Sequence, residues 1–420
     1  ESSTYNTAVG YAAGTAVSTG TNNTLVGGTT GQALTTGGNN VAMGYGALYT
    51  DDVGSHSVAI GVSALQNQNT ATAASVYNTA VGSQAGLSIT TGVRNTVIGA
   101  LTGDALTTGI RNVAIGFQAL TTDTKGQRTV AIGHNALSAQ NFTTATDAFN
   151  TAVGHEAGAA VTTGIQNTLL GAHSGDALTD ADFNVAVGTY ALTADTLGSF
   201  NVAVGWGTLF NQNFTTATSS YNTAVGHGAG SAVTTGIYNT LIGGLAGDAL
   251  TDADNNVAVG RAALSTDTLG SCSVAIGRNA LVTQNFTTAT DSFNVAVGDR
   301  AGAAVTTGIK NVLIGGLAGD ANTVGFNNIA IGYDALGTNT SSGANVAIGY
   351  EALKTYNNTT EASHFNTAVG TQAGKALTTG IQNTLMGGNA GDALTDGNHN
   401  VAFGLGALGS DTLGSRSTAL

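Results

Sequence analysis

The chain has 420 residues, of which 62 are glycine, none is proline and only 8% are charged. Polar low-complexity chains of this kind are often disordered, but 42% of the residues are apolar and recur at fixed places, which excludes disorder. The formal net charge of −13 excludes a basic footprint for nucleic acid, and no apolar run is long enough for a transmembrane helix. We therefore expect no nucleic-acid partner and a chain that is not embedded in a membrane.

The whole chain repeats one phrase. An aromatic residue followed by asparagine recurs every 72 residues, at Tyr5, Tyr77, Phe149, Tyr221, Phe293 and Phe365. These positions mark super-repeats, and we predict that residues 1–420 form a single continuous repeat array. Because the last repeat stops incomplete at Leu420, we expect this chain to be a segment of a longer one.

Each super-repeat contains four shorter units, whose starts are spaced by 17, 17, 17 and 21 residues. In the third super-repeat each start is an asparagine followed four residues later by glycine: Asn150 and Gly154, Asn167 and Gly171, Asn184 and Gly188, Asn201 and Gly205. The same register gives 24 starts in the chain, of which 20 are asparagine, and glycine occupies all 23 of the following positions that fall inside it. Such regularity identifies these positions as structural.

The phrase around each start has the two-residue period of a β-strand. Thr151 and Val153 face one way, whereas Asn150 and Ala152 face the other. Seventeen residues are too few for a strand–helix repeat but suit one coil with short strands. We therefore predict an all-β chain, a parallel β-solenoid (β-roll) of about 24 coils. The glycine predicts a positive φ or a close backbone approach, and the asparagine predicts a ladder of side-chain amides.

Alanine and glycine dominate each coil, so a single chain encloses little apolar volume. Association of several chains would supply the missing core. We expect a homotrimer.

Two phrases carry a resemblance to known proteins. Residues 273–281 (SVAIGRNAL) and 345–353 (NVAIGYEAL) resemble the head repeats of the YadA-like trimeric adhesins. The recurring Thr-Thr-Gly and Asn-Thr pairs resemble repeat arrays in phage tail-fibre-like proteins. The resemblance covers essentially the whole chain and implies a trimeric left-handed parallel β-roll that serves as a fibre or an adhesive head. The coils here are longer than in the adhesin pattern, which leaves handedness and anchoring open.

Titratable residues do not break the repeat at one place, as a catalytic site would. The seven histidines are His56, His134, His155, His173, His227, His364 and His399, and only His155 and His227 are equivalent within the 72-residue period. This variation is typical of solvated side chains, so we expect no catalytic residue, no metal site and no cofactor. An aspartate recurs at Asp104, Asp176, Asp248, Asp320 and Asp392. We expect it to cap a turn through its own backbone amides, with calcium binding as the alternative.

The fourth unit carries four additional residues, in stretches such as QNFTTAT at 212–218 and 284–290. Inserts of this kind often make the contacts of repeat proteins, which makes Phe142, Phe214 and Phe286 candidate contact residues. In the alternative interpretation, each ring packs back on the edge of its coil.

These observations favour a non-enzymatic structural or adhesive fibre, the shaft or head of a phage tail fibre or a related virion appendage that mediates host attachment. Its partners would be further copies of itself and a glycan or protein on the host cell surface. Its location would be extracellular or on the virion surface. The alternative is a bacterial surface adhesin of the trimeric-autotransporter type or an extracellular structural filament. An enzyme on this scaffold would need a cleft that breaks the repeat.

Overall fold

The computed structural model describes residues 4–420, which form short β-strands and turns and contain no α-helix. This part of the chain accordingly offers no apolar helix of membrane-spanning length. The chain divides into two compact units. The first runs to Trp206 and includes Asn213–Ser219, and the second comprises Gly207–Gln212 and Ser220–Leu420. That both belong to one continuous array stays a prediction.

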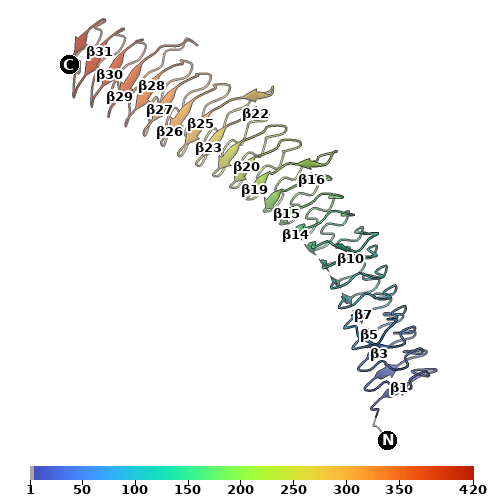
Figure 1. Cartoon of the computed structure of the whole chain (residues 1–420). Helices are drawn as coiled ribbons and strands as arrows, with labels where there is room; N and C mark the ends of the chain where they lie inside the picture. Colours follow the sequence, from blue (N-terminus) through green and yellow to red (C-terminus); the bar gives the residue numbers. More distant parts are fainter. Residues whose placement is uncertain (1–3) are drawn as a thin grey trace. The chain divides into compact units, whose positions relative to one another are not determined.

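The first unit is a parallel β-solenoid. Its described residues contain twelve three-residue strands, one in each turn. They are β1 (Thr7–Val9), β2 (Thr24–Val26), β3 (Val41–Met43), β5 (Val58–Ile60), β7 (Thr79–Val81), β8 (Thr96–Ile98), β9 (Val113–Ile115), β11 (Val130–Ile132), β13 (Thr151–Val153), β14 (Thr168–Leu170), β15 (Val185–Val187) and β17 (Val202–Val204). Strands such as β1, β3, β5 and β7 follow one another along one side of the unit (Figure 1).

Consecutive strands pair in parallel without a shift in register. Thr151 of β13 pairs with Thr168 of β14, and Ala152 pairs with Leu169. Beneath the inserts, two-residue strands form separate parallel pairs: β4 (Gly54–Ser55) with β6 (Ala74–Ser75), β10 (Gly126–Gln127) with β12 (Thr146–Asp147), and β16 (Gly198–Ser199) with β18 (Thr218–Ser219).

The second unit has the same construction, with twelve strands in its main sheet. They are β19 (Thr223–Val225), β20 (Thr240–Ile242), β21 (Val257–Val259), β23 (Val274–Ile276), β25 (Val295–Val297), β26 (Val312–Ile314), β27 (Ile329–Ile331), β28 (Val346–Ile348), β29 (Thr367–Val369), β30 (Thr384–Met386), β31 (Val401–Phe403) and β32 (Thr418–Ala419). An insert pair is formed by β22 (Gly270–Ser271) and β24 (Thr290–Asp291). The predicted all-β parallel solenoid of about 24 turns is therefore confirmed.

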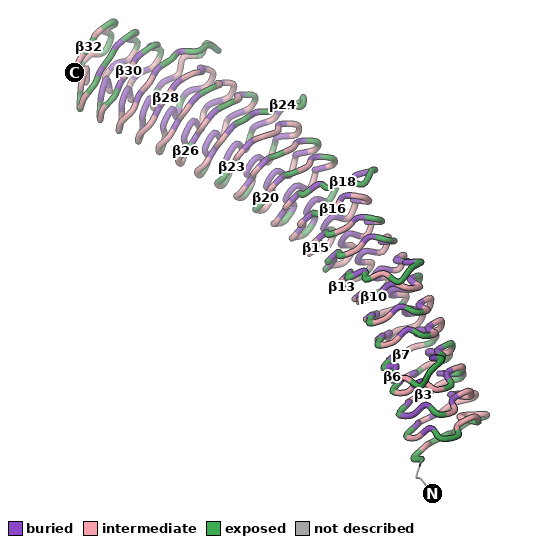
Figure 2. The backbone as a smooth tube through the Cα atoms, in the orientation of Figure 1, coloured by how far each residue is buried: buried purple, intermediate pink, exposed green. Residues whose placement is uncertain are grey.

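The predicted two-residue alternation of side-chain direction agrees with the burial of the side chains. Asn150 and Ala152 are buried, whereas Thr151 and Val153 are partly exposed. In Figure 2, buried stretches accordingly alternate with partly exposed and exposed ones around the turns. From β2 to β31, the middle residue of each three-residue strand is thus buried in the core, and the first and third residues point outward; in β1, at the end of the described chain, all three residues are exposed.

The recurring asparagines link each turn to the next. The side-chain Nδ2 of Asn167 donates to the carbonyl of Ala181 at 2.8 Å, and its Oδ1 accepts the backbone N–H of Asn184 at 2.9 Å. Direct bonds between side-chain amides occur only at some steps, for example from Nδ2 of Asn383 to Oδ1 of Asn366 at 3.1 Å. The predicted ladder therefore exists, but its regular rung joins a side chain to the backbone.

The recurring glycines meet the predicted requirement for both a positive φ and a close approach. Gly154 has a φ of +146°, and a Cβ placed on it would lie 2.4 Å from the carbonyl oxygen of Gly171 in the next turn. Core leucines explain other glycines, since a Cβ on Gly175 would lie 2.8 Å from Cδ2 of Leu169. Large and small residues thus compensate one another within the core.

Candidate functional site

The three phenylalanines considered as contact residues are buried: Phe142, Phe214 and Phe286 are each only 6% exposed. A Cβ on Gly198 would lie 2.8 Å from Cδ2 of Phe214, and one on Gly270 would lie 2.7 Å from Cδ2 of Phe286. The rings therefore pack back on their coils, and they do not offer a surface to a receptor.

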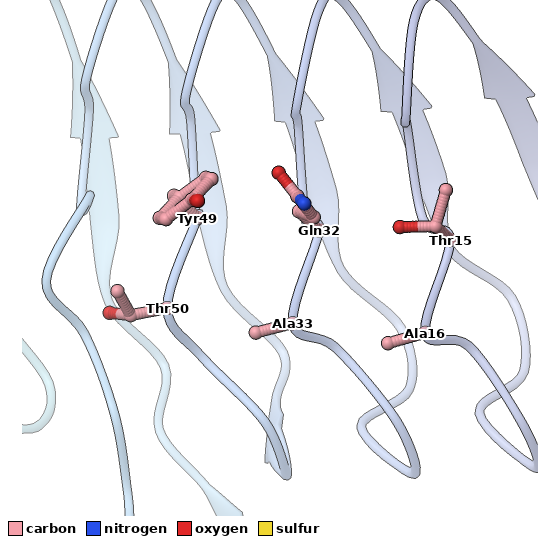
Figure 3. A pocket seen from close by; sticks show the side chains of 6 residues that line it. All are labelled: Thr15, Ala16, Gln32, Ala33, Tyr49 and Thr50. Atoms are coloured by element: carbon pink, nitrogen blue, oxygen red, sulfur yellow. The ribbon is translucent and has the colours of Figure 1, made fainter.

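An open groove of about 500 Å³ lies in the first unit beside β1, β2 and β3 (Figure 3). It is lined by Thr15, Ala16, Gln32, Ala33, Tyr49 and Thr50. Thr15, Gln32 and Tyr49 come from successive turns and lie side by side (Figure 3). The polar groups of this lining are the hydroxyls of Thr15, Tyr49 and Thr50 and the amide of Gln32.

Two of the five recurrent aspartates join neighbouring turns through their side chains. Oδ1 of Asp104 accepts the hydroxyl of Thr121 at 2.5 Å, and Asp176 accepts the hydroxyl of Thr193. We predicted that each aspartate accepts hydrogen bonds from the backbone amides of its own turn. For these two residues the prediction is incomplete, because it omitted the bond to the neighbouring turn. Asp320 does interact with backbone N–H groups of its own turn, as predicted.

A buried polar cluster lies beneath the inserts. Nε2 of Gln140 donates to Asp123 at 2.7 Å and to the hydroxyl of Thr129 at 3.1 Å, while its Oε1 accepts from Asn150 at 2.9 Å. Burial raises the pKa of Asp123, which also accepts the backbone N–H of Phe142. Because the cluster satisfies its own polar groups, we interpret it as structural.

The fifth super-repeat fills the same place with other residues. Asn339 and Tyr356 stand where the earlier repeats have aspartate and glutamine, and the Tyr356 hydroxyl lies 2.7 Å from Nδ1 of His364. Nε2 of His364 lies 3.1 Å from the hydroxyl of Thr360. His364 is 5% exposed, and burial lowers its pKa. The expectation that all histidines are solvated is wrong for this residue, which is a neutral member of the core.

Glu351 lies at the centre of a group of charged side chains. Its carboxylate accepts hydrogen bonds from Lys354 and Lys375 at 2.7 Å each and from Gln372 at 3.0 Å. Lys354 also pairs with Asp334 at 2.9 Å. The hydrogen bonds from Lys354 and Lys375 lower the pKa of Glu351 from 4.5 to about 2. The group joins three successive turns of the second unit.

We expect Glu351→Gln to weaken the turns around Glu351 at pH 7 but not near pH 1.5. Because the folded pKa is the lower one, the carboxylate stabilises the folded turns fully above pH 4.5, and this contribution is lost as the pH falls through about 2. Hydrogen exchange of the Glu351 and Leu353 amides, which bond to neighbouring turns, would measure the effect. Glu361→Gln, at an exposed position, is the control. A difference between Glu351→Gln and the native chain that persists near pH 1.5 would contradict this assignment.

Cys272 is partly buried. Burial and the nearby charge of Asp291 raise the pKa of its thiol. The thiol is therefore protonated at neutral pH, which is the opposite of what a catalytic cysteine requires.

Three histidines on successive turns of the first unit lie side by side. The rings of His134 and His155 are stacked with centroids 5.0 Å apart, and those of His155 and His173 meet edge to face at 5.3 Å. Glu156 lies beside them, with Oε1 4.0 Å from Nε2 of His155 and Oε2 3.4 Å from Nδ1 of His173. Comparison over the 72-residue period missed this group, because its members are neighbours in consecutive turns. The signal was available, since His134 and His155 both stand five residues after a unit start.

Neither protein-family models nor curated proteins match this chain.

Proposed function

We propose that the chain is a non-enzymatic structural and adhesive fibre, the shaft or head of a phage tail fibre or a related virion appendage. In this proposal its turns of 17, 17, 17 and 21 residues serve as a spacer, three copies associate, and the assembly attaches to a glycan or protein of a host cell surface. Its location would then be extracellular or on the virion surface. The observation that carries the proposal is the outward face of the strands.

We define the outer strand face as the first and third residues of every strand in the main sheet of each unit. These residues are partly or fully exposed, and every one is threonine, valine, isoleucine, leucine, methionine or phenylalanine, apart from the terminal pair Thr418–Ala419. Leu170 is 46% exposed and Val9 is 58% exposed. With strands about 4.8 Å apart, twelve turns make an apolar strip of roughly 500 Å² in each unit. Exposed patches of this size are often functional.

Another copy of the same chain is the partner that fits this strip best. Its apolar side chains recur at the strand spacing, so a matching surface needs the same repeat over the same length. The chain itself supplies such a surface, and closed symmetric assemblies are the usual result of self-association. The single chain already buries a core of leucine and alanine, and three strips around one axis would bury in addition the outward side chains that the single chain leaves exposed.

Introducing charge into the strip tests this assignment. We expect the double variant Ile98→Lys/Ile115→Lys to raise the dissociation constant of the assembly at least tenfold, because burying each ammonium group costs several kcal/mol. Both side chains point outward from β8 and β9, so the fold of the single chain should be retained. Sedimentation velocity would measure association, and circular dichroism would report the fold. Thr143→Lys, on an exposed insert, is the matched control. An unchanged dissociation constant for the double variant would remove the strip as the interface.

Host attachment is assigned in this proposal to the exposed tips of the inserts, residues 143–145, 215–217 and 287–289. These tips are rich in threonine and project beside the buried phenylalanines. Replacing all three tips with glycine and serine should abolish binding of the fluorescently labelled assembly to host cells. The number of chains in the variant assembly should be the same as in the native one. Retained binding would place the receptor site elsewhere. A bacterial surface adhesin of the same fold is the alternative, and a membrane anchor in the flanking sequence would favour it over a virion appendage.

A further inference from the structure

We propose that His134, His155 and Glu156 bind a divalent transition-metal ion, with Zn²⁺ as the preferred ion, on the surface of the first unit. One ligand atom from each of these three side chains lies within 4.8 Å of the other two. The proposal concerns a site separate from the outer strand face, and it does not depend on the proposed fibre function.

The solenoid itself brings the two imidazoles together. His134 follows β11 and His155 follows β13, and these strands pair directly in parallel. Side chains at the same position of adjacent turns are therefore separated by about the strand spacing of 4.8 Å. The observed ring separation of 5.0 Å, with only 8° between the ring planes, agrees with that spacing. The backbone of Glu156 is tied to the same pair of turns, because its N–H donates to the carbonyl of His134 at 2.9 Å.

Binding of an ion requires the two imidazole rings to rotate out of their stack, because rings only 8° from parallel direct their nitrogens into separate planes. Two ligands of a tetrahedral Zn²⁺ site, with bonds of about 2.0–2.1 Å, are about 3.3 Å apart. His155 Nε2 and Glu156 Oε1 already lie 4.0 Å apart. His134 and His155 are exposed, which leaves space for this rotation, although rotation of His134 also gives up its stacking on Phe117, whose ring centroid lies 5.7 Å away. Exposure also leaves room for water at the remaining coordination position.

His173 and Asp176 lie beside the carboxylate. Nδ1 of His173 is hydrogen-bonded to Oδ2 of Asp176 at 3.2 Å and lies 3.4 Å from Oε2 of Glu156. The ring of His173 is in turn stacked on Tyr190, with 9° between the two planes. His173 thus closes one side of the group, while Oε1 of Glu156 lies on the side of His155.

The ligand types define the ion. Two imidazoles with one carboxylate are typical of Zn²⁺ and related transition metals, whereas Ca²⁺ prefers six to eight oxygen ligands. Calcium ions are therefore a suitable negative probe of the same site.

The chain contains its own control for this site. The positions 72 residues after His134, His155, Glu156 and His173 hold Trp206, His227, Gly228 and Leu245. The second unit thus repeats one histidine of the group on the same scaffold and lacks the other ligands. His227→Asn removes an imidazole from an equivalent position without affecting the proposed site.

Isothermal titration of the full chain with Zn²⁺ tests the proposal. We expect one site per chain in the native protein and in His227→Asn, and at least a tenfold loss of affinity in His134→Asn and in His155→Asn. Ca²⁺ should give no binding at this site. Hydrogen exchange provides a second readout, since Zn²⁺ should slow exchange of the Glu156 amide in the native chain and not in His155→Asn.

Three results would overturn the proposal. They are a native chain that takes up no Zn²⁺ at about 1 mM, a His155→Asn variant that binds as tightly as the native chain, and an equal loss of affinity in His227→Asn. Because His134 and His155 are exposed, their replacement should not unfold the chain, and the exchange pattern without metal would verify this.

Discussion

Replacing Gly154 with alanine is expected to lower the free energy of unfolding of its turn by more than about 3 kcal/mol. The backbone there has a φ of +146°, which residues other than glycine rarely adopt. The added Cβ would also lie 2.4 Å from the oxygen and 2.6 Å from the carbon of the Gly171 carbonyl. Both are backbone atoms of a paired turn, so no side-chain rotation relieves the clash. Hydrogen exchange of amides in the turns containing β13 and β14 would measure the loss.

Gly46→Ala is the matched control for this prediction. Gly46 also has a positive φ, +65°, but the nearest atom to an added Cβ is the Ser63 hydroxyl oxygen at 3.8 Å. The equivalent position of the first turn holds Ala12 with a φ of 55°. We expect a cost of no more than about 1 kcal/mol. Equal effects of the two substitutions would contradict the predicted cost of a side chain in the glycine column.

Replacing Asn167 with alanine is expected to cost about 2–4 kcal/mol. The substitution removes both side-chain bonds of the fully buried Asn167 and leaves the Asn184 N–H and the Ala181 carbonyl without their partners. Orphaned buried polar groups cost more than the bond that they lose. Asn167→Asp should be at least as damaging, because it retains the acceptor, removes the donor and buries a charge. Exchange protection of the turns at β14 and β15 would report the change.

Asn69→Ala is the control for the asparagine ladder. Asn69 is exposed, and its backbone N–H bond to Thr90 does not involve the side chain. We expect an effect within about 0.5 kcal/mol. If Asn167→Ala costs no more than Asn69→Ala, the ladder does not hold the turns together.

The strand and the glycine that follows it were predictable because each turn stacks on a turn of nearly the same sequence. Asn150, Ala152 and Gly154 lie against the same residue types above and below, so the repeat reports their packing directly. The two-residue period predicted that Thr151 and Val153 share the face opposite to Asn150 and Ala152, and the burial of Ala152 shows that Thr151 and Val153 point outward. The detail of the ladder was not predictable, since the choice of a backbone partner depends on the exact path of the turn.

Two features of the structure, the group of histidines and the buried His364, were not predicted from the 72-residue period. His134 and His155 are 21 residues apart, so a comparison over 72 residues separates what the fold brings together. His364 was mistaken for a surface residue because its partner, Tyr356, changed in the same super-repeat. One super-repeat earlier, the equivalent positions hold Gln284 and Ser292. The simultaneous change of both residues is the sequence signal of a rearranged buried cluster. A residue that differs between super-repeats is therefore expected to be exposed to solvent only when no neighbouring residue changes in the same super-repeat.

We propose that the outer strand face joins copies of this chain into a fibre, and sedimentation equilibrium of the native chain in dilute buffer tests this association. We predict a particle with about three times the 41.2 kDa mass of one chain. A monomer of 41.2 kDa that persists as the concentration is raised would contradict the claim.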